Sequence, residues 1–280
     1  METCDLHTHS VYSDGTLTPA EIIDLAVKKG IKAVALCDHN TIDGLPEFLS
    51  AAKERDLEAV PGAEFSVDYS GKELHLLALF IPEESFPKID EIMNEVILRK
   101  EQNYIKLFAA LNEAGYKIDY KTVKASTPKG KFNRANIAAE LMRLGYTKSI
   151  KEAFNTLLSP KTGYYKEPER PDAFYMIDFI NEIGAVPVLA HPFLNLSENE
   201  LEAFLPKAKK AGLVGMECIY SENDEETTQK SFDLANRYGL KYSGGSDFHG
   251  DTKPGIGLGS GKGNLKIPYQ FLSTLKDYKK

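Results

Sequence analysis

The first fifteen residues, METCDLHTHSVYSDG (1–15), place three candidate metal ligands directly after a short apolar run. These ligands are His7, His9 and Asp14, which fall within eight residues of one another. Mixed imidazole and carboxylate groups suit divalent ions such as Zn, Mn or Fe. Two histidines two residues apart carry little information by themselves, so the interpretation depends on where the other histidines and carboxylates lie.

The segments that follow alternate between helix and strand patterns. TPAE (18–21) combines an N-cap hydroxyl, a proline at the first helical position and a glutamate that can close a capping box. The apolar run AVALCDH (33–39) comes next and ends on Asp38 and His39. Such alternation predicts an α/β fold, either a barrel or an open parallel sheet. We expect seven strands, at about 3–7, 33–38, 58–65, 73–80, 186–191, 213–219 and 241–246.

The middle of the chain lacks this alternation. A long amphipathic helix is expected from Ile89 to Ala114, followed by two shorter helical patterns around 135–145 and 149–158. The alternation resumes after Pro171. We therefore predict one α/β domain made of 1–82 and 171–280, with a mainly helical insertion at 83–170.

The histidines of the chain follow the predicted strands. Five of the six lie at or just beyond the carboxyl end of a strand. The six are His7, His9, His39, His75, His191 and His249, and carboxylates at similar positions are Asp14, Asp38, Glu64, Glu217 and Asp247. Barrels and open α/β sheets build their sites at that edge. About nine ligands exceed what one ion uses, so we expect two or three divalent ions.

His75 differs from the other histidines because it lies near the start of its predicted strand. YSGK (69–72) separates this strand from the preceding one and reads as a hairpin turn. If so, the strand runs antiparallel, and its beginning shares an edge with the end of the strand that carries Glu64. His75 then joins the other candidate ligands.

The bulk composition limits the classes of partner. The formal net charge of −7 disfavours a long electrostatic contact with nucleic acid, which needs a basic face. The odd number of cysteines (Cys4, Cys37 and Cys218) indicates packing in a reducing compartment rather than a disulfide framework. No signal peptide is evident, and no apolar run approaches the roughly 18 to 20 residues that span a bilayer. We expect a cytoplasmic protein with no membrane partner.

The motifs resemble those of the PHP family (polymerase and histidinol phosphatase). They are HTHSVYSDG (7–15), CDHNTIDG (37–44), PGAEFS (61–66), ELHLL (73–77), AHP (190–192) and GSDFHG (245–250). They follow the family's order over nearly the whole chain, and the middle segment resembles the insertion of the small stand-alone PHP phosphoesterases. The resemblance implies a distorted seven-stranded (β/α) barrel, similar to a TIM barrel, with a trinuclear metal site.

The resemblance also implies three sets of ligands at matching positions. His7, His9, Glu64 and Asp247 would hold one ion. Glu64, as a bridge, would hold the second ion with His75 and His191. Asp14, His39 and His249 would hold the third. Asp38 and Glu217 would stand behind these ligands and orient imidazoles or bound water.

The helical insertion is expected to supply substrate contacts. Many members of the family carry a stretch like R-P-H-I-A in the insertion, whereas this chain reads RANIA (134–138). Arg134 remains a candidate phosphate clamp. Asn136, in place of histidine, can hydrogen-bond a phosphate but cannot act as an acid. Lys129, Lys131 and Lys166 are further candidates, although a solvated helix surface is the favoured explanation for each of these lysines.

The resemblance implies a metal-dependent phosphoric monoester or diester hydrolase. We expect hydroxide held by the ions to attack a phosphate ester of a small nucleotide. The substrates would be 3′,5′-nucleoside bisphosphates and the 5′ ends of short RNA. A phosphatase for histidinol phosphate or another metabolite is the first alternative, and a non-catalytic metal-binding regulatory module is the second. An unrelated metal-dependent amide hydrolase is a weaker option.

Overall fold

The computed structural model describes residues 2–55, 57–127, 132–161, 163–263 and 265–278. The chain forms two compact units. The barrel unit runs from the N-terminus to Glu91 and resumes at Arg170, and the helical unit is Ile92–Glu169. The first boundary falls inside helix α3 (Phe86–Glu113), later than the expected residue 83.

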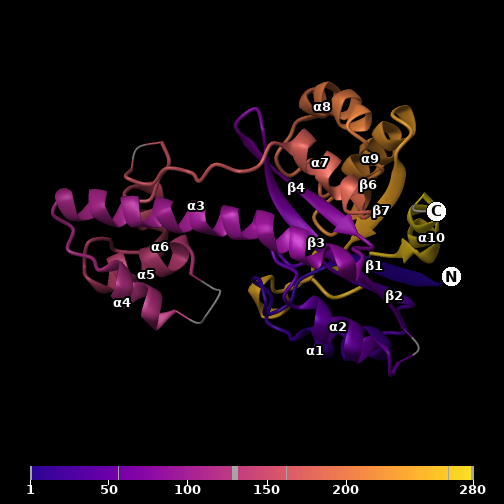
Figure 1. Cartoon of the computed structure of the whole chain (residues 1–280), viewed down its shortest axis with the longest axis horizontal. Coiled ribbons are helices and arrows are strands. Elements are labelled where there is room, and N and C mark those ends of the chain that lie inside the picture. The colour runs from indigo at the N-terminus through magenta and orange to yellow at the C-terminus, as the bar shows by residue number, and fades with distance from the viewer. Residues whose placement is uncertain (1, 56, 128–131, 162, 264, 279–280) are drawn as a thin grey trace. The chain divides into compact units, whose positions relative to one another are not determined.

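The strands of the barrel unit form one sheet that almost closes on itself (Figure 1). The strands are β1 (Thr3–Thr8), β2 (Ala33–Leu36), β3 (Glu58–Tyr69), β4 (Lys72–Leu79), β5 (Val186–Leu189), β6 (Gly215–Tyr220), β7 (Lys241–Gly245) and β8 (Ile267–Pro268). Their order is β7-β6-β5-β4-β3-β2-β1-β8. The segment after β7 meets β1, because Asp247 N donates to His7 O at 2.9 Å and His9 N donates to Phe248 O at 2.9 Å. A barrel, rather than an open sheet, is therefore confirmed.

All seven expected strands are present, and the predicted hairpin is confirmed. β3 and β4 are antiparallel, with Ser66 paired to His75. The turn between them has Ser70 at φ 53° and Gly71 at φ 77°, as a two-residue hairpin turn requires. The eighth strand, β8, pairs antiparallel with β1 and was not expected, because two residues carry no periodic pattern.

Helices surround the strands of the barrel unit. They are α1 (Pro19–Lys28), α2 (Leu45–Ala52), α7 (Ala173–Glu182), α8 (Glu198–Lys210), α9 (Glu225–Arg237) and α10 (Tyr269–Tyr278), with short 3₁₀ turns η1 (Glu83–Ser85) and η2 (Gly250–Thr252). Helices α1 and α2 cover one side of the strands, and α7, α8 and α9 cover the other (Figure 1). Thr18 and Glu21 form the predicted capping box at the start of α1.

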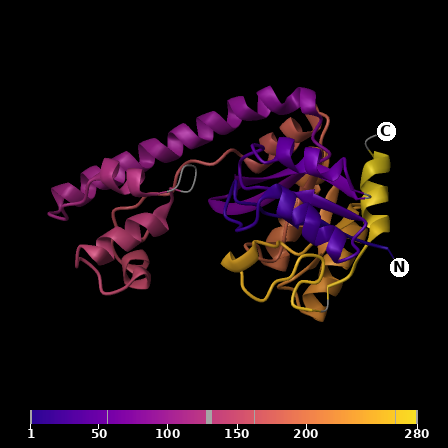
Figure 2. The ribbon, with the colours of Figure 1, turned by 90° about the horizontal axis from the view of Figure 1, so that it is seen from below.

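Helix α10, which the sequence analysis missed, packs against the amino-terminal end of the barrel. Its Leu272 and Leu275 are buried with Leu6, Leu77 and Val188 of the strands in one apolar core. The start of α10 lies beside the start of the chain, since Tyr269 N donates to Glu2 O at 3.0 Å, and α10 runs along that side of the barrel unit (yellow in Figure 2). All three cysteines are buried and unpaired, as expected.

The helical unit has its own core. It contains the distal part of α3, α4 (Tyr120–Ser126), α5 (Arg134–Arg143) and α6 (Ile150–Asn155). Phe108 and Leu111 of α3 pack with Ile137 and Leu141 of α5, and all four are buried. The short helix α4 was not expected, although Asp119 caps it by accepting from Thr122 N at 2.8 Å.

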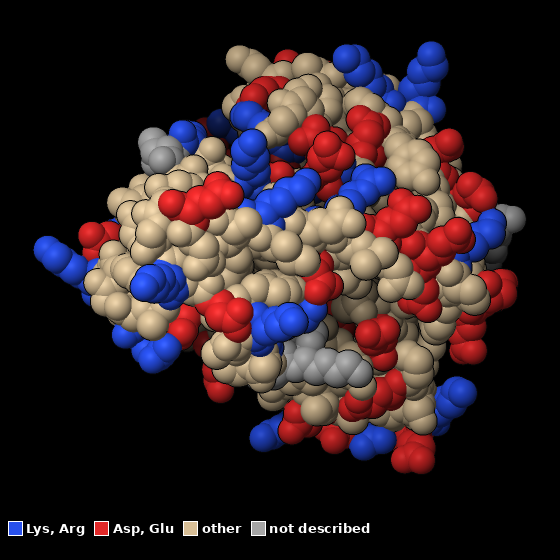
Figure 3. All heavy atoms as spheres, turned by 60° about the vertical axis from the view of Figure 1, so that its left-hand side comes forward, with Lys and Arg blue, Asp and Glu red and all other residues tan. Residues whose placement is uncertain are grey.

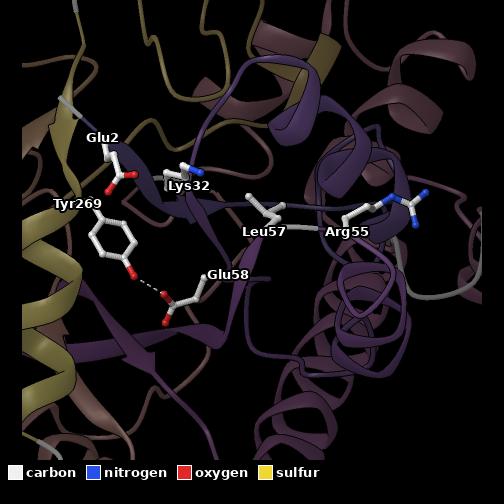
Figure 4. A pocket seen from close by; sticks show the side chains of 6 residues that line it. All are labelled: Glu2, Lys32, Arg55, Leu57, Glu58 and Tyr269. Atoms are coloured by element: carbon white, nitrogen blue, oxygen red, sulfur yellow. Dashed lines mark hydrogen bonds between the residues drawn. The ribbon is translucent and has the colours of Figure 1, made fainter.

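A hollow of about 400 Å³ opens at the amino-terminal edge of β1, β2 and β3 (Figure 4). Its lining includes Glu2, Lys32, Arg55 and Glu58. The Glu58 carboxylate already accepts hydrogen bonds from Tyr269 at 2.5 Å and from Lys276 at 2.7 Å. Both oxygens of this carboxylate are therefore already paired. Within the described residues, no helix is long and apolar enough to cross a membrane.

Candidate metal centre

The nine residues expected as metal ligands converge at the carboxyl ends of the parallel strands. Contacts of 3.8 Å or less between ring nitrogens and carboxylate oxygens join all of them into one cluster. They are His7, His9, Asp14, His39, Glu64, His75, His191, Asp247 and His249. His75 lies among them because β4 runs antiparallel to β3.

Glu64, on β3, occupies the middle of the cluster. Its Oε2 atom lies 3.3 Å from Nε2 of His7, 3.3 Å from Nε2 of His9 and 3.0 Å from Nδ1 of His39. Its Oε1 atom lies 2.9 Å from Nδ1 of His75 and 2.9 Å from Nε2 of His191. A carboxylate whose two oxygens face different groups of imidazoles has the arrangement that a bridge between two ions needs.

A second group of ligand atoms lies around Asp14. His249 Nε2 is 3.1 Å from Asp14 Oδ1, and His39 Nε2 is 3.8 Å from Asp14 Oδ2. Three groups of residues each bring one ligand atom per residue within 4.8 Å of the others. The groups are His9, Asp14, His39 and His249; His7, His9 and Glu64; and His39, Glu64 and His75. His9 and His39 thus each belong to two such groups.

Several buried atoms of this cluster lack a well-aligned hydrogen bond. Among the described residues, seven buried side-chain nitrogens and oxygens have no partner. Four belong to the cluster: Nε2 of His7, His9 and His249, and Oε2 of Glu64. Leaving such a group unpaired costs about 1–3 kcal/mol. Divalent ions would satisfy all four atoms, so the residues present fit a metal centre.

The crowding of imidazoles and carboxylates shifts their pKa values. Burial opposes the change, but the carboxylates of Glu64 and Glu73 raise the pKa of His75 to about 10. Burial also lowers the pKa of His7, but the carboxylates of Glu64 and Glu217 outweigh this effect. The pKa of His7 therefore lies well above its usual range. Burial and the neighbouring His39 lower the pKa of His9 to about 3. The protein groups alone therefore favour protonated imidazoles at some ligand positions.

The backbone at the centre is held in sparsely populated conformations. Asp247 has φ 56° and His191 has φ 25°, and such angles in non-glycine residues persist only when the surroundings enforce them. Gly245 allows β7 to approach β1, because a Cβ atom there would lie 2.1 Å from His7 Cβ. The close contact between the first and last parallel strands brings Asp247 next to the His7 and His9 motif.

Glu217 and Asp38, expected behind the ligands, act on different groups. Glu217 Oε1 lies 3.0 Å from His7 Nδ1, and its Oε2 accepts from the backbone N of His191 at 2.7 Å. Asp38 accepts from Ser10 N, Ser10 Oγ and Ser13 Oγ at 2.7 Å each. Asp38 therefore orders the loop after β1, and it reaches an imidazole through Ser13, whose Oγ lies 3.5 Å from His9 Nδ1.

Four further residues around the centre were missed by the sequence analysis. Glu73 Oε1 lies 3.5 Å from His75 Nε2, and Glu73 Oε2 lies 2.7 Å from the guanidinium of Arg170. Asp5 accepts from Ser246 N at 2.8 Å and so fixes the residue before Asp247. Tyr220 donates to Asp247 Oδ2 at 3.1 Å, and Lys253 Nζ lies 2.6 Å from the same oxygen. Alternation along β4 could have found Glu73, two residues before His75.

The expected substrate contacts lie in the helical unit. The Arg134 guanidinium, at the first residue of α5, stacks over Tyr165 at 4.2 Å and lies 5.5 Å from the ring of Phe154. Asn136 Oδ1 accepts from Asn133 N at 2.8 Å and so serves in the helix cap. Lys166 is exposed and its carbonyl accepts from Asn103. Lys129 and Lys131 lie outside the described residues.

Known proteins with similar sequences or folds carry names of phosphate-ester chemistry. A 5′-3′ exoribonuclease of Haemophilus influenzae is 30% identical over 246 residues, 88% of this chain and 89% of the relative. A 3′,5′-nucleoside bisphosphate phosphatase of Chromobacterium violaceum is 28% identical over 262 residues, 92% of this chain and 91% of the relative. A phosphoribosyl 1,2-cyclic phosphate 1,2-diphosphodiesterase of Eggerthella lenta is 28% identical over 255 residues, 88% and 94% of the two chains.

The fold similarity extends over both units of the chain. A crystal structure of a protein described as a metal-dependent phosphoesterase, from Bifidobacterium adolescentis, matches with a TM-score of 0.77 and 28% identity, over 98% of this chain and 95% of the other. The model of the PHP domain family matches residues 5–167, more than half of the sequence. With the motifs and the convergent ligands, these similarities show that the chain belongs to the PHP domain family.

Proposed function

We propose that the chain hydrolyses a phosphate ester of a small nucleotide. Its main substrates would be 3′,5′-nucleoside bisphosphates, with the 5′ ends of short oligoribonucleotides as a second class. The observation that carries this proposal is the convergence of buried, unpartnered imidazole and carboxylate atoms around Glu64. The names of the exoribonuclease and bisphosphate phosphatase relatives support a nucleotide rather than another phosphate ester.

The nine ligands would hold two or three divalent ions, Mn, Fe or Zn, in the sets that the family resemblance implies. Bound ions supply positive charge for the phosphoryl oxygens and lower the pKa of a coordinated water. The protein orients the rings that face them. His249 Nδ1 donates to Asp247 O at 2.8 Å, which turns Nε2 toward Asp14, and Glu217 holds the ring of His7.

The surface charge supports a small substrate over long nucleic acid. The formal net charge is −7, and acidic side chains lie among the basic ones on the face drawn in Figure 3. A long duplex or single strand is held by many phosphate contacts from a basic surface. We also infer a reducing compartment such as the cytoplasm, because the three cysteines are unpaired thiols.

Other reactions could use the same ligands. The relative named for a 1,2-cyclic phosphate of ribose favours a cyclic phosphodiester as the second candidate substrate. Histidinol phosphate or another metabolite ester stays an alternative, and so does a non-catalytic metal-binding role.

The substrate proposal is tested with Mn-loaded protein by chromatographic measurement of substrates and products, because cleavage of a phosphodiester yields a phosphomonoester and releases no inorganic phosphate. The assay compares adenosine 3′,5′-bisphosphate, a 5′-phosphorylated RNA dinucleotide, a ribose 1,2-cyclic phosphate and histidinol phosphate. We expect kcat/KM for the first two to exceed the others by about 100-fold, a difference of about 2.7 kcal/mol in transition-state stabilisation. A preference for either of the other two compounds would contradict the nucleotide assignment.

Arg134→Ala is expected to weaken the binding of a bisphosphate more than the binding of a simple monoester. Loss of a charge-assisted hydrogen bond of about 1.5–3 kcal/mol should raise KM for adenosine 3′,5′-bisphosphate by about 10- to 100-fold. KM for a small monoester such as p-nitrophenyl phosphate should change little. Arg143→Ala is the matched control, since Arg143 lies at the other end of α5 and pairs with Glu140. Equal losses on both substrates would exclude the clamp.

A further inference from the structure

Asp247 presents its two carboxylate oxygens to different surroundings. Oδ1 faces the imidazoles, at 3.3 Å from His9 Nε2 and 3.3 Å from His249 Nδ1. Oδ2 accepts from the Tyr220 hydroxyl at 3.1 Å and lies 2.6 Å from the Lys253 ammonium. A cation is therefore held directly behind the oxygen that faces the metal centre.

The segment that carries Lys253 is fixed to the Asp14 loop. Thr252 Oγ1 donates to Asp14 O at 2.9 Å, and Asp251 N donates to Thr16 Oγ1 at 3.0 Å. Gly250, at φ 64°, permits this contact, because a Cβ atom there would lie 2.0 Å from Thr16 Oγ1. Lys253 is thus presented by a turn that is tied to two expected ligands, Asp14 and Asp247.

Lys253 differs from Arg170, which also reaches the edge of the cluster. The Arg170 side chain is 15% exposed and is hydrogen-bonded to Glu73, which in turn contacts His75. The Lys253 side chain is 39% exposed. An ammonium has three N–H donors, and the contact with Asp247 uses one of them. The remaining donors can bind an anion that enters from solvent beside Asp247.

From this geometry we propose that Lys253 binds a phosphoryl oxygen of the substrate next to the metal centre. The inference rests on the proposed function and adds a substrate contact supplied by the barrel unit itself. Lys253 would then bind the phosphoryl group that lies at the ligands. The competing role is a positioning one, in which Lys253 only neutralises and holds Asp247.

Two equilibrium measurements distinguish these roles without turnover. Calorimetric titrations give the Kd of Mn²⁺ for each variant, and then the Kd of inorganic phosphate for the Mn-loaded protein. Lys253→Met should raise the Kd of phosphate by about tenfold or more, the usual effect of losing a hydrogen bond to a charged group. Lys253→Arg should restore most of the affinity. The Kd of Mn²⁺ should stay within about twofold in both variants, where a lost metal-orienting contact would typically cost 10–100-fold.

Lys262→Met is the matched control. Lys262 follows in the same connection to β8, is exposed and pairs with Glu222 rather than with a ligand, so its loss should leave phosphate binding unchanged. Equal phosphate affinity in the wild type and Lys253→Met would overturn the inference. So would a Kd of Mn²⁺ that rises in parallel with that of phosphate. If the protein hydrolyses no nucleotide but phosphate binding still depends on Lys253, the proposed function fails and this contact stands.

Discussion

Glu64→Gln is expected to lower kcat/KM for adenosine 3′,5′-bisphosphate by about 10³-fold or more, since losing even one group that stabilises the transition state costs 10²–10³-fold. The effect should be large because both oxygens of Glu64 face imidazoles. Glutamine has nearly the same shape, but its NH₂ group cannot ligate an ion and its charge is lost. We expect the metal content, measured by elemental analysis, to fall together with the activity.

The control for this substitution lies on the same strand. Glu58→Gln changes a carboxylate at the first residue of β3, where Tyr269 and Lys276 bind it. This variant should keep its metal content and its kcat/KM. A Glu64→Gln protein that retains full metal content and activity would show that Glu64 does not bridge the ions.

Metal binding at neutral pH is expected to release protons. His75 has a pKa of about 10 and the pKa of His7 is also raised, because carboxylates surround both rings despite their burial. Both rings are then protonated at pH 7.5 and must lose a proton to coordinate an ion, so roughly two protons should leave per chain. Because protons compete with the ions, affinity should rise as pH increases toward 10. Titration calorimetry of chelator-treated protein in buffers of different ionisation enthalpy measures the number of protons released.

The Glu73→Gln variant isolates the contribution of His75. Glu73 is one of the two carboxylates that raise the pKa of His75, so its neutralisation should lower that pKa. Fewer protons should then be released at pH 7.5. If the wild type releases none, or if affinity falls with rising pH below pH 9, the assigned protonation of the cluster is wrong.

The sequence predicts the α/β fold and the positions of its ligands because both depend on local patterns, whereas closure into a barrel was implied only by the family resemblance. Ser70 and Gly71 form a two-residue hairpin turn, and this one turn reverses β4 and brings His75 to the edge that carries Glu64. The other ligands follow parallel strands, whose carboxyl ends meet at one edge of the barrel. The seven strands are therefore predictable from the helix–strand alternation together with this turn.

The missed features depend on contacts between distant segments. β8 has only two residues, and its pairing with β1 is visible only once the chain is folded. Asp5 acts on Ser246, which is 241 positions away. Lys253 contacts Asp247 at short range but belongs to no repeating pattern. Asp38 was expected to orient imidazoles or bound water, and the sequence could not show that Ser10 and Ser13 are its direct partners. In the helical unit, the family resemblance indicated Arg134 but could not show that it stacks on Tyr165.

The central claim, that these convergent side chains form a metal centre for nucleotide phosphate-ester hydrolysis, is tested most directly by one measurement. Phosphate release from adenosine 3′,5′-bisphosphate is followed with chelator-treated protein before and after addition of Mn²⁺, with bound metal determined on the same samples. We predict no release without the ions and full activity once two or three Mn²⁺ are bound per chain. Activity that persists without metal, or an inactive protein with its ions bound, would contradict the account.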